Sequence, residues 1–395
     1  MTKNTKKSLK VGFHSLVEKR QISKQDVPAV LNIFLPGKCN LQCTYCFVHK
    51  EKKNFDDIDE KAIKKAIDIF LAYIGKHKTL SFNGGEPLLE WNLIRTLCEY
   101  AKVKAKKNGI ALDIIIVTNG TLLRQKHIDF FKKNNVLIKI SIDGDKKTHD
   151  KKRFFGTKKT KSSFDAIMKN IQNIDSESVK FSASLVFGPE TVINLLKNIE
   201  FLQQKNFKYI DFYPEIYATW NKADLEKLEN ETRKIEKYYV ETFRSKSENL
   251  FRTSMLDMLL SGPSNGSREI CGKIQVDAMG NFFACDKIFS LPKKSREQYL
   301  VGNSKIGIVE EKRRHFLDDN REKILNRTKL KCGTCRFKKY CTCAIGQYVY
   351  KKSNNSEDFE FWQSFCEVSK ILIAMNLRII KKLEYDEIFV ALNRF

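Results

Sequence analysis

The sequence contains no run of eighteen apolar residues, which excludes an ordinary transmembrane helix. Its first ten residues are polar and rich in lysine, and they lack the apolar stretch of a secretory signal. It also has no internal repeat and no low-complexity tract. These absences favour a globular cytoplasmic protein without a membrane partner, and its length of 395 residues suggests two or three domains.

The sequence also gives no sign of a disulfide framework. Its eleven cysteines are odd in number and unevenly spaced, and such a framework would need an export signal. Cysteines that cluster in a reducing compartment are better explained as metal ligands. Cys98 stands apart on a predicted amphipathic helix, so we expect it to be a small buried apolar residue.

Acidic residues are scarce compared with basic ones. Lys and Arg number 72 against 47 Asp and Glu, which gives a formal net charge of +25. This charge would suit nucleic acid, an anionic surface or an acidic partner peptide. The lysines are scattered over the whole chain, however, as expected for solvated faces, so charge alone does not identify a partner.

Short apolar runs alternate with amphipathic, charged stretches of helical period such as Glu60–Ile74 and Leu93–Lys107. The apolar runs, taken as strands, are Ala29–Leu35, Thr79–Phe82, Ile114–Thr118, Leu137–Ile142, Phe181–Phe187 and Tyr209–Tyr213. This alternation predicts an α/β fold in which parallel strands and crossover helices form an open or closed barrel. Chemistry in such barrels gathers at the carboxyl ends of the strands.

Three cysteines follow the first predicted strand in a C-x3-C-x2-C triplet: Cys39, Cys43 and Cys46. Three thiolates on one short loop can bind three irons of a 4Fe–4S cluster and leave the fourth iron open to another ligand. A zinc site is the alternative, because His49 is near in sequence and zinc accepts such ligands.

The triplet, with Tyr45 before its third cysteine, resembles the motif of the radical S-adenosylmethionine (SAM) superfamily. The resemblance implies a partial (β/α)6 TIM-like barrel. It also implies that SAM chelates the open iron and that one electron cleaves its sulfonium. The 5′-deoxyadenosyl radical then abstracts a hydrogen atom from a substrate.

Loops after the next predicted strands resemble further motifs of the superfamily, and the resemblance implies that they bind SAM. The GGEP motif would bind the cofactor's amino group, residues after the fourth strand would lie near the ribose, and an arginine would pair with the carboxylate. The residues matched in this way are Gly84, Gly85, Glu86, Pro87, Asn119, Ser141, Asp143 and Arg153.

A second cysteine group resembles the SPASM extension, a module that carries auxiliary iron–sulfur clusters in peptide-modifying radical enzymes. Its seven members are Cys271, Cys285, Cys332, Cys335, Cys341, Cys343 and Cys366. The resemblance implies one 4Fe–4S cluster on Cys332, Cys335, Cys341 and Cys366, and a second on Cys271, Cys285 and Cys343. Eight residues, one fewer than usual, precede Gly280, and C-x-C replaces C-x3-C. A structural zinc site is the alternative.

The two modules suggest a division of the chain. We expect an N-terminal arm (1–24), a radical SAM barrel (25–220), a helical bridge (221–262), a SPASM domain (263–370) and a C-terminal helix (371–395). The leader-recognition domain of many peptide maturases would not fit before Ala29. A separate leader-binding protein is therefore a possible partner, besides a reductant such as flavodoxin or ferredoxin.

Enzymes with both modules mostly act on polypeptides. One branch, the anaerobic sulfatase maturases, oxidises Cys or Ser to formylglycine, and Asp286 resembles the carboxylate that serves as their base. Asp286 could equally be a structural acid of the cluster loop. Asn83 and Val48 stand where those enzymes have Gln and Tyr, and their eighth cysteine is missing.

We therefore favour the other branch, maturases that crosslink, oxidise or epimerise residues of ribosomally made peptides. Sulfatase maturation is the alternative. A nucleic-acid modifying radical enzyme would suit the charge, but no RNA-binding module is recognisable. A zinc-binding scaffold without catalysis is the remaining hypothesis.

Overall fold

The computed structural model describes residues 28–48, 57–156, 161–172, 174, 179–245, 250–260, 272–317, 334–337, 340 and 359–384. The predicted N-terminal arm lies outside the described residues, and so do four of the predicted ligands: Cys271, Cys332, Cys341 and Cys343.

Strands and helices alternate along the first half of the described chain. The strands are β1 (Val30–Phe34), β2 (His77–Asn83), β3 (Ala111–Thr118), β4 (Val136–Ser141), β5 (Phe181–Phe187), β6 (Ile210–Pro214), β7 (Lys273–Asp277), β8 (Asn281–Phe283), β9 (Leu300–Asn303) and β10 (Gly307–Ile308). The α-helices are α2 (Glu60–Ala72), α3 (Trp91–Lys107), α4 (Gln125–Asn134), α5 (Lys146–Lys152), α6 (Ser163–Ile171), α7 (Leu195–Gln204), α8 (Lys222–Arg244), α9 (Ser254–Leu260), α10 (Lys293–Arg296) and α13 (Phe359–Lys382). Short 3-10 helices are η1 (Pro87–Glu90), η2 (Val192–Asn194), η4 (Asp286–Ser290) and η5 (Glu297–Tyr299).

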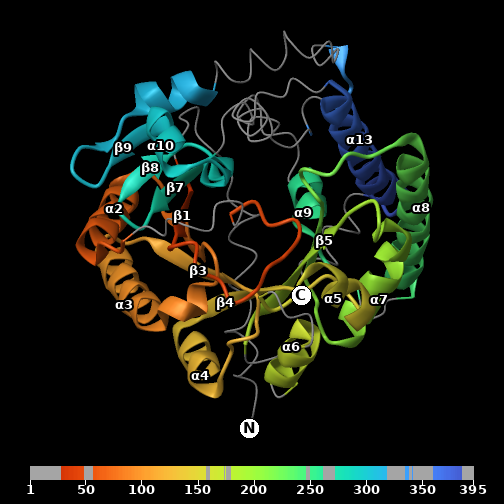
Figure 1. Cartoon of the computed structure of the whole chain (residues 1–395), viewed down its shortest axis with the longest axis horizontal. Coiled ribbons are helices and arrows are strands. Elements are labelled where there is room, and N and C mark those ends of the chain that lie inside the picture. The colour runs from red at the N-terminus through yellow and green to blue at the C-terminus, as the bar shows by residue number, and fades with distance from the viewer. Residues whose placement is uncertain are drawn as a thin grey trace.

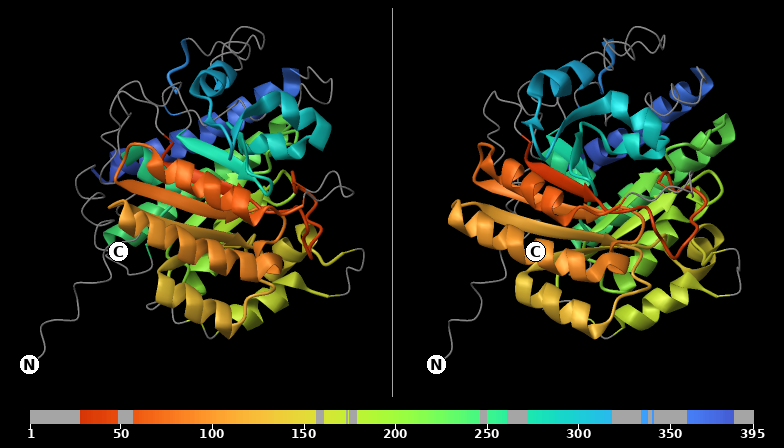
Figure 2. Two further views of the ribbon diagram at one scale, coloured as in Figure 1. Left: turned by 90° about the vertical axis from the view of Figure 1, so that its left-hand side faces the viewer. Right: turned by 60° about the vertical axis from the view of Figure 1, so that its left-hand side comes forward.

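The strands form one sheet in the order β10-β9-β8-β7-β1-β2-β3-β4-β5-β6. Strands β1 to β6 are parallel throughout, and the sheet curves with helices around its outer side (Figures 1 and 2). The predicted fold class, a partial (β/α)6 barrel, is confirmed. Among the described elements, β7 pairs parallel to β1 on the other side, and β8 to β10 continue the sheet antiparallel.

Helix α2 shows why these segments fold as they do. Its buried residues are Ile63, Ala66, Ile67, Phe70 and Leu71, a spacing that places them on one face of a helix. Asp59 caps the start, because its side chain accepts a hydrogen bond from the backbone N–H of Ala62.

The strands alternate their side chains between the helix-covered face and the inner face of the barrel. On β4, Ile138 and Ile140 are fully buried, whereas Lys139 and Ser141 are partly exposed. We call the second set, with its neighbours in register on the other strands, the barrel face. The carboxyl end of this face is the edge where the predicted motifs should meet.

The second half of the chain departs from the prediction in two places. The predicted helical bridge (221–262) is not one helix, because α8 ends at Arg244 and Arg252 pairs with Tyr209 before α9 begins. Helix α13 passes through residue 371 without a break and packs along α8 (Figure 1). None of the described helices is long and apolar enough to cross a membrane.

Candidate functional site

The cysteine triplet lies on a loop that leaves the carboxyl end of β1, and all three thiols are partly exposed. Backbone hydrogen bonds pin this loop to the segment after α5. Gln42 N–H donates to the Phe154 carbonyl (2.8 Å), and Thr44 N–H donates to that of Lys152 (2.9 Å). The loop therefore has a defined path that the polypeptide itself maintains.

The two glycines of the GGEP segment lie against this loop. A Cβ on Gly85 would stand 2.0 Å from the Lys38 carbonyl oxygen, and one on Gly84 would stand 2.6 Å from that of Leu35. The Gly84 φ of +138° is also a conformation that favours glycine. The absence of a side chain at these two positions therefore allows the backbone of the cysteine loop to pack closely against the GGEP segment.

The Glu86 carboxylate joins the ends of β2 and β3. It is buried and accepts hydrogen bonds from the Thr118 hydroxyl (2.6 Å) and from the backbone N–H groups of Asn119 (2.7 Å) and Leu88 (3.0 Å). Burial raises the pKa of Glu86 to about 6, although these donors oppose the shift. Glu86 thus holds the GGEP segment and the next loop together.

Asn119 connects the end of β3 to the first cysteine. Its amide donates to the Asn40 side chain (2.9 Å), and the same nitrogen lies 3.7 Å from the Cys39 sulfur. Asn40 in turn donates to the Thr121 hydroxyl (2.8 Å). Asn40 and Thr121 are not predicted from the sequence, because the partner of a polar loop residue cannot be identified from its neighbours in the chain.

Tyr45, Asp143 and Arg153 form a buried cluster beside the second cysteine. Arg153 binds Asp143 in a bidentate pair (2.9 and 3.2 Å), and the Tyr45 hydroxyl donates to the same carboxylate. The Arg153 guanidinium also lies 5.1 Å from the centre of the Tyr45 ring and 3.9 Å from the Cys43 sulfur. The site therefore holds a fixed positive charge beside Cys43.

His149 is hydrogen-bonded to the backbone of this cluster. Its Nδ1 accepts the Asp143 backbone N–H (3.2 Å), and its Nε2 lies 3.0 Å from the Ser163 hydroxyl, which donates to the Arg153 carbonyl (2.6 Å). Burial lowers the pKa of His149 to about 4, so the ring stays neutral at pH 7.

A family model described as "Radical SAM superfamily" matches residues 33–202, the segment that carries every element of this site. The chain carries a radical SAM domain. The predicted recognition is confirmed, and with it the expectation that SAM and a 4Fe–4S cluster are the cofactors.

Relatives resemble the chain beyond the radical SAM domain. It is 26% identical over 392 residues to a cysteine-type anaerobic sulfatase-maturating enzyme of Clostridium novyi (strain NT), covering 89% of this chain and 96% of the relative. The solved structure of native anSMEcpe with bound AdoMet and the Cp18Cys peptide has a TM-score of 0.68 at 20% identity, covering 93% and 99%. Streptococcus suis SuiB bound to precursor peptide SuiA has a TM-score of 0.57 at 16% identity, covering 85% and 74%.

The donor set of the radical SAM domain fits an iron–sulfur cluster. Burial raises the pKa of Cys39 to about 11 and that of Cys43 to about 12, the latter against the effect of Arg153. Thiols bind metal as thiolates, so cluster binding releases protons here. Within the described ranges, no three His, Cys, Asp or Glu side chains lie close enough together to bind a single metal ion. This does not conflict with a cluster, because each cysteine of an iron–sulfur cluster binds a different iron.

The described part of the second cysteine group consists of Cys285, Cys335 and Cys366. Cys335 and Cys366 are both near enough to Lys370 to raise the pKa of its ammonium, although the hydrogen bond to Glu367 has the larger effect. That they share a cluster remains a prediction. Cys98 is fully buried in the apolar core, as predicted.

Asp286, the predicted base, begins η4 directly after Cys285. Its carboxylate pairs with the Lys287 ammonium (2.9 Å) and keeps 37% of its surface exposed. Burial alone would raise the pKa of Asp286, but Lys287 and the more distant Lys273 hold it below its usual value. The Lys287 ammonium also lies 4.4 Å from the centre of the Phe47 ring, so Asp286 is tied to the residue that follows Cys46.

The structure therefore brings most predicted residues to one end of the barrel. Ser141 ends β4 on the barrel face, and Pro87 begins η1 behind the glycine pair. Their expected contacts with SAM, like those of Asp143 and Arg153, remain predictions.

Proposed function

We propose that the radical SAM domain of this chain oxidises a Cys or Ser side chain within a polypeptide, as sulfatase-maturating enzymes do. Similarity to such an enzyme over almost its whole length supports this choice. It replaces our preference for a maturase that crosslinks, oxidises or epimerises residues of a ribosomally made peptide, which the comparisons do not favour over sulfatase maturation.

The ionised Asp286 carboxylate beside the cysteine loop is the observation that carries the proposal. Its carboxylate is ionised at neutral pH, as a base must be, and the Lys287–Phe47 contact holds it beside the cysteine loop that would bind the radical-forming cluster.

Oxidation of the substrate residue removes one hydrogen atom, one proton and one electron. SAM and its cluster supply a carbon radical that removes one hydrogen atom from the substrate Cβ. Asp286 takes the proton of the thiol or hydroxyl as the C=S or C=O bond forms, and one electron leaves the residue. The proposed auxiliary cluster on Cys271, Cys285 and Cys343 would accept that electron. Hydrolysis of a thioaldehyde formed from Cys then gives the aldehyde and hydrogen sulfide.

Maturation of a ribosomally made peptide is the second candidate. It is favoured by Asn83, which stands in place of the sulfatase maturases' Gln. The Asn83 amide donates hydrogen bonds to the hydroxyl and carbonyl of Ser81 (3.0 and 3.2 Å). A flavodoxin or ferredoxin reductant, a separate leader-binding protein and the expected domain boundaries other than that at 370/371 are part of this proposal.

The test uses the anaerobically reconstituted enzyme with a sulfatase-derived Cys peptide and with a small peptide co-expressed from a neighbouring gene. Asp286→Asn should lower the ratio of oxidised peptide to 5′-deoxyadenosine by roughly a hundredfold, because a positioned base contributes that much. Asp129→Asn, an exposed carboxylate on α4, is the matched control.

Mass spectrometry distinguishes the candidates. Exchange of the thiol for an aldehyde in the sulfatase peptide supports the first, and a crosslink or other mass change in the co-expressed peptide supports the second. Unaltered oxidation by Asp286→Asn would remove the role of Asp286. No change in either peptide, with activity on RNA, would overturn the proposal as a whole.

A further inference from the structure

A second polar group lies on the barrel face, outside every motif considered so far. Lys139 of β4 reaches across β5 to Asp211 of β6, with 2.5 Å between the ammonium nitrogen and the nearer carboxylate oxygen. The residues of β5 in register with them are Ser182 and Ser184. These short side chains leave the space through which the long lysine passes.

This ion pair is withdrawn from water. Asp211 is 3% exposed and also accepts the Ser254 backbone N–H at 2.7 Å, while Lys139 is 21% exposed. Burial would lower the pKa of Lys139, but Tyr213 and Asp211 outweigh it and raise the pKa, so the side chain stays cationic. Desolvation makes such a pair no more stabilising than an apolar pair of the same size. Its presence therefore calls for a role other than stability.

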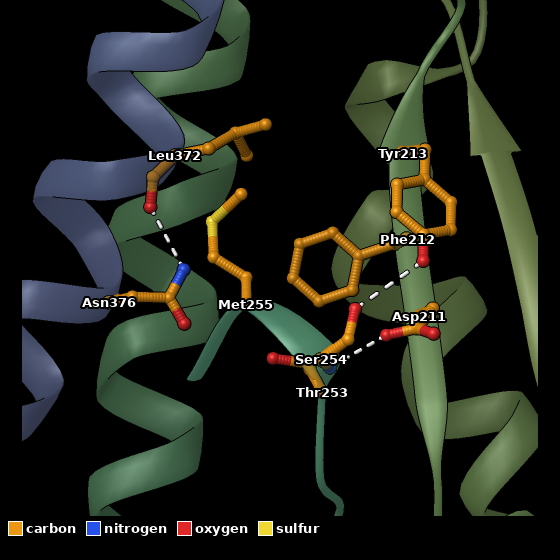
Figure 3. Close-up of a pocket in the computed structure, with 8 residues that line it drawn as sticks. All are labelled: Asp211, Phe212, Tyr213, Thr253, Ser254, Met255, Leu372 and Asn376. Carbon is orange, nitrogen blue, oxygen red and sulfur yellow. Dashed lines mark hydrogen bonds between the residues drawn. The ribbon is translucent and has the colours of Figure 1, made fainter. Parts of the chain in front are cut away.

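Tyr213 is the exposed neighbour of this ion pair. Its hydroxyl accepts a hydrogen bond from Lys139 (3.4 Å) and lies 3.4 Å from the Ser254 hydroxyl, while the side chain is 40% exposed. Figure 3 shows Tyr213 and Asp211 beside a pocket that Met255 and Leu372 close on the far side. The pocket is small, and its enclosed space is close to that of a single water-sized group.

The strand register places Tyr213 level with the cofactor end of the barrel. Tyr213 pairs with Val186 of β5, and the Val186 backbone N–H donates to the Asp143 carboxylate (2.9 Å). Adjacent strands are about 4.8 Å apart. Tyr213 is thus one strand away from Val186, the residue whose backbone binds Asp143 of the Tyr45–Asp143–Arg153 cluster. Strand β6 is the last strand of the described sheet on this side.

We propose that Tyr213 and Lys139 anchor an acceptor oxygen of the substrate polypeptide, either a backbone carbonyl or a side-chain carboxylate. A lysine ammonium has three N–H donors, and within the described residues two are used, by Asp211 and Tyr213. The third and the Tyr213 hydroxyl are the donors for the substrate. The inference rests on the proposed function, because it requires a peptide in the barrel.

The experiment measures binding of the same two peptides to the holoenzyme by calorimetry. Tyr213→Phe keeps the ring and should weaken peptide binding by roughly tenfold, the value of one hydrogen bond. Lys139→Met is combined with Asp211→Asn so that no buried charge is left alone, and it should weaken binding at least as much. Tyr100→Phe removes a hydroxyl that binds Asp68 on the outer helices and serves as the control.

Parallel measurement of SAM binding separates a lost anchor from a collapsed barrel. A loss of peptide binding alone supports the inference, and peptides with amides in place of carboxylates then identify the oxygen. Unchanged peptide binding by both variants, while the wild type binds and modifies a peptide, overturns the inference alone. A wild type that binds neither peptide overturns it together with the proposed function, and equal losses of SAM and peptide binding also count against it.

Discussion

At the scale of single residues, the site depends on close backbone approach as much as on side-chain chemistry. The glycine pair and the Glu86 carboxylate fix three loops relative to one another, and none of them needs to contact a cofactor to do so. Motif residues of this kind are constrained by the protein around them. Their loss should therefore damage cluster binding itself.

Gly85→Ala tests this directly. The added Cβ would meet the Lys38 carbonyl at 2.0 Å, and relief of such overpacking costs roughly 1–3 kcal/mol. We expect the variant to lose most of the iron bound by the cysteine triplet and to form 5′-deoxyadenosine at least about tenfold more slowly.

Gly109→Ala is the control for this substitution. Gly109, unlike Gly85, has a positive φ (+64°), so its substitution strains the backbone, but no atom lies within 4 Å of its added Cβ. Iron and acid-labile sulfide, measured per folded chain, should stay at the wild-type level in the control. Equal iron in both variants would show that the close approach at Gly85 is unimportant.

Residue identity could be predicted at the site, whereas residue pairing could not. Cys39, Glu86 and Arg153 stand in motifs whose spacing is visible in the sequence. Asn40 and Lys139 find their partners 79 and 72 positions away, and only the folded sheet brings those pairs together.

At the scale of elements, helices α8 and α13 join the far side of the barrel to the end of the chain. The buried Glu236 of α8 binds Arg378 (2.6 Å) and Lys382 (2.8 Å) of α13. Burial would raise the pKa of Glu236, but these two cations lower it below the ordinary value. The carboxylate should therefore stabilise the contact at neutral pH.

Glu236→Ala should lower the free energy of unfolding by roughly 1–3 kcal/mol at pH 7, as expected for hydrogen bonds to charged groups. Because the folded-state pKa is depressed, the contribution is present above the unfolded pKa and is lost as the pH falls through the folded value. The difference from the wild type in urea titrations should accordingly shrink in acid.

Glu229→Ala on the same helix is the matched control, since Glu229 forms an exposed pair with Arg233. Such a pair contributes at most about 0.5 kcal/mol. Equal losses from the two substitutions would contradict the importance of the α8–α13 contact.

Elements with a clean period could be located from sequence. Strand β5 has the predicted bounds, and the other five barrel strands differ from prediction by at most three residues at either end. Strand β7 was missed, because a short strand following a cysteine has no distinctive pattern and gains its place only by pairing with β1. The break near Arg252 was missed for the same reason, since its partner Tyr209 is distant in sequence.

At the scale of the whole molecule, one sheet connects the radical SAM domain to the cysteine-rich segment. Strand β7 pairs with β1, and Lys287 then returns to Phe47 beside the triplet. The segment that contains Cys285 is thereby attached to the sheet strand that precedes the cysteine triplet. Whether both bind clusters can be measured by counting metal.

Simultaneous replacement of Cys39, Cys43 and Cys46 by Ala should remove about four irons per chain and abolish 5′-deoxyadenosine formation. About four further irons should be lost when Cys335 and Cys366 are replaced as well, and the rest when Cys285 is also replaced. Replacement of Cys98, which is buried in the apolar core, is the control and should leave the iron content unchanged. Zinc in place of iron after anaerobic reconstitution, at either group, would contradict the cluster assignment.

The hydrogen bonds that pin the cysteine loop also bear on upkeep of the enzyme. The loop is fastened at Gln42 and Thr44 to the segment after α5, and at Lys38 to the Glu86 backbone. Because these hydrogen bonds join backbone to backbone and do not involve the cysteine sulfurs, we expect the path of the loop to survive oxygen damage to the cluster. Renewed activity after addition of iron, sulfide and a reductant to the damaged enzyme, without a denaturation step, would agree with this expectation.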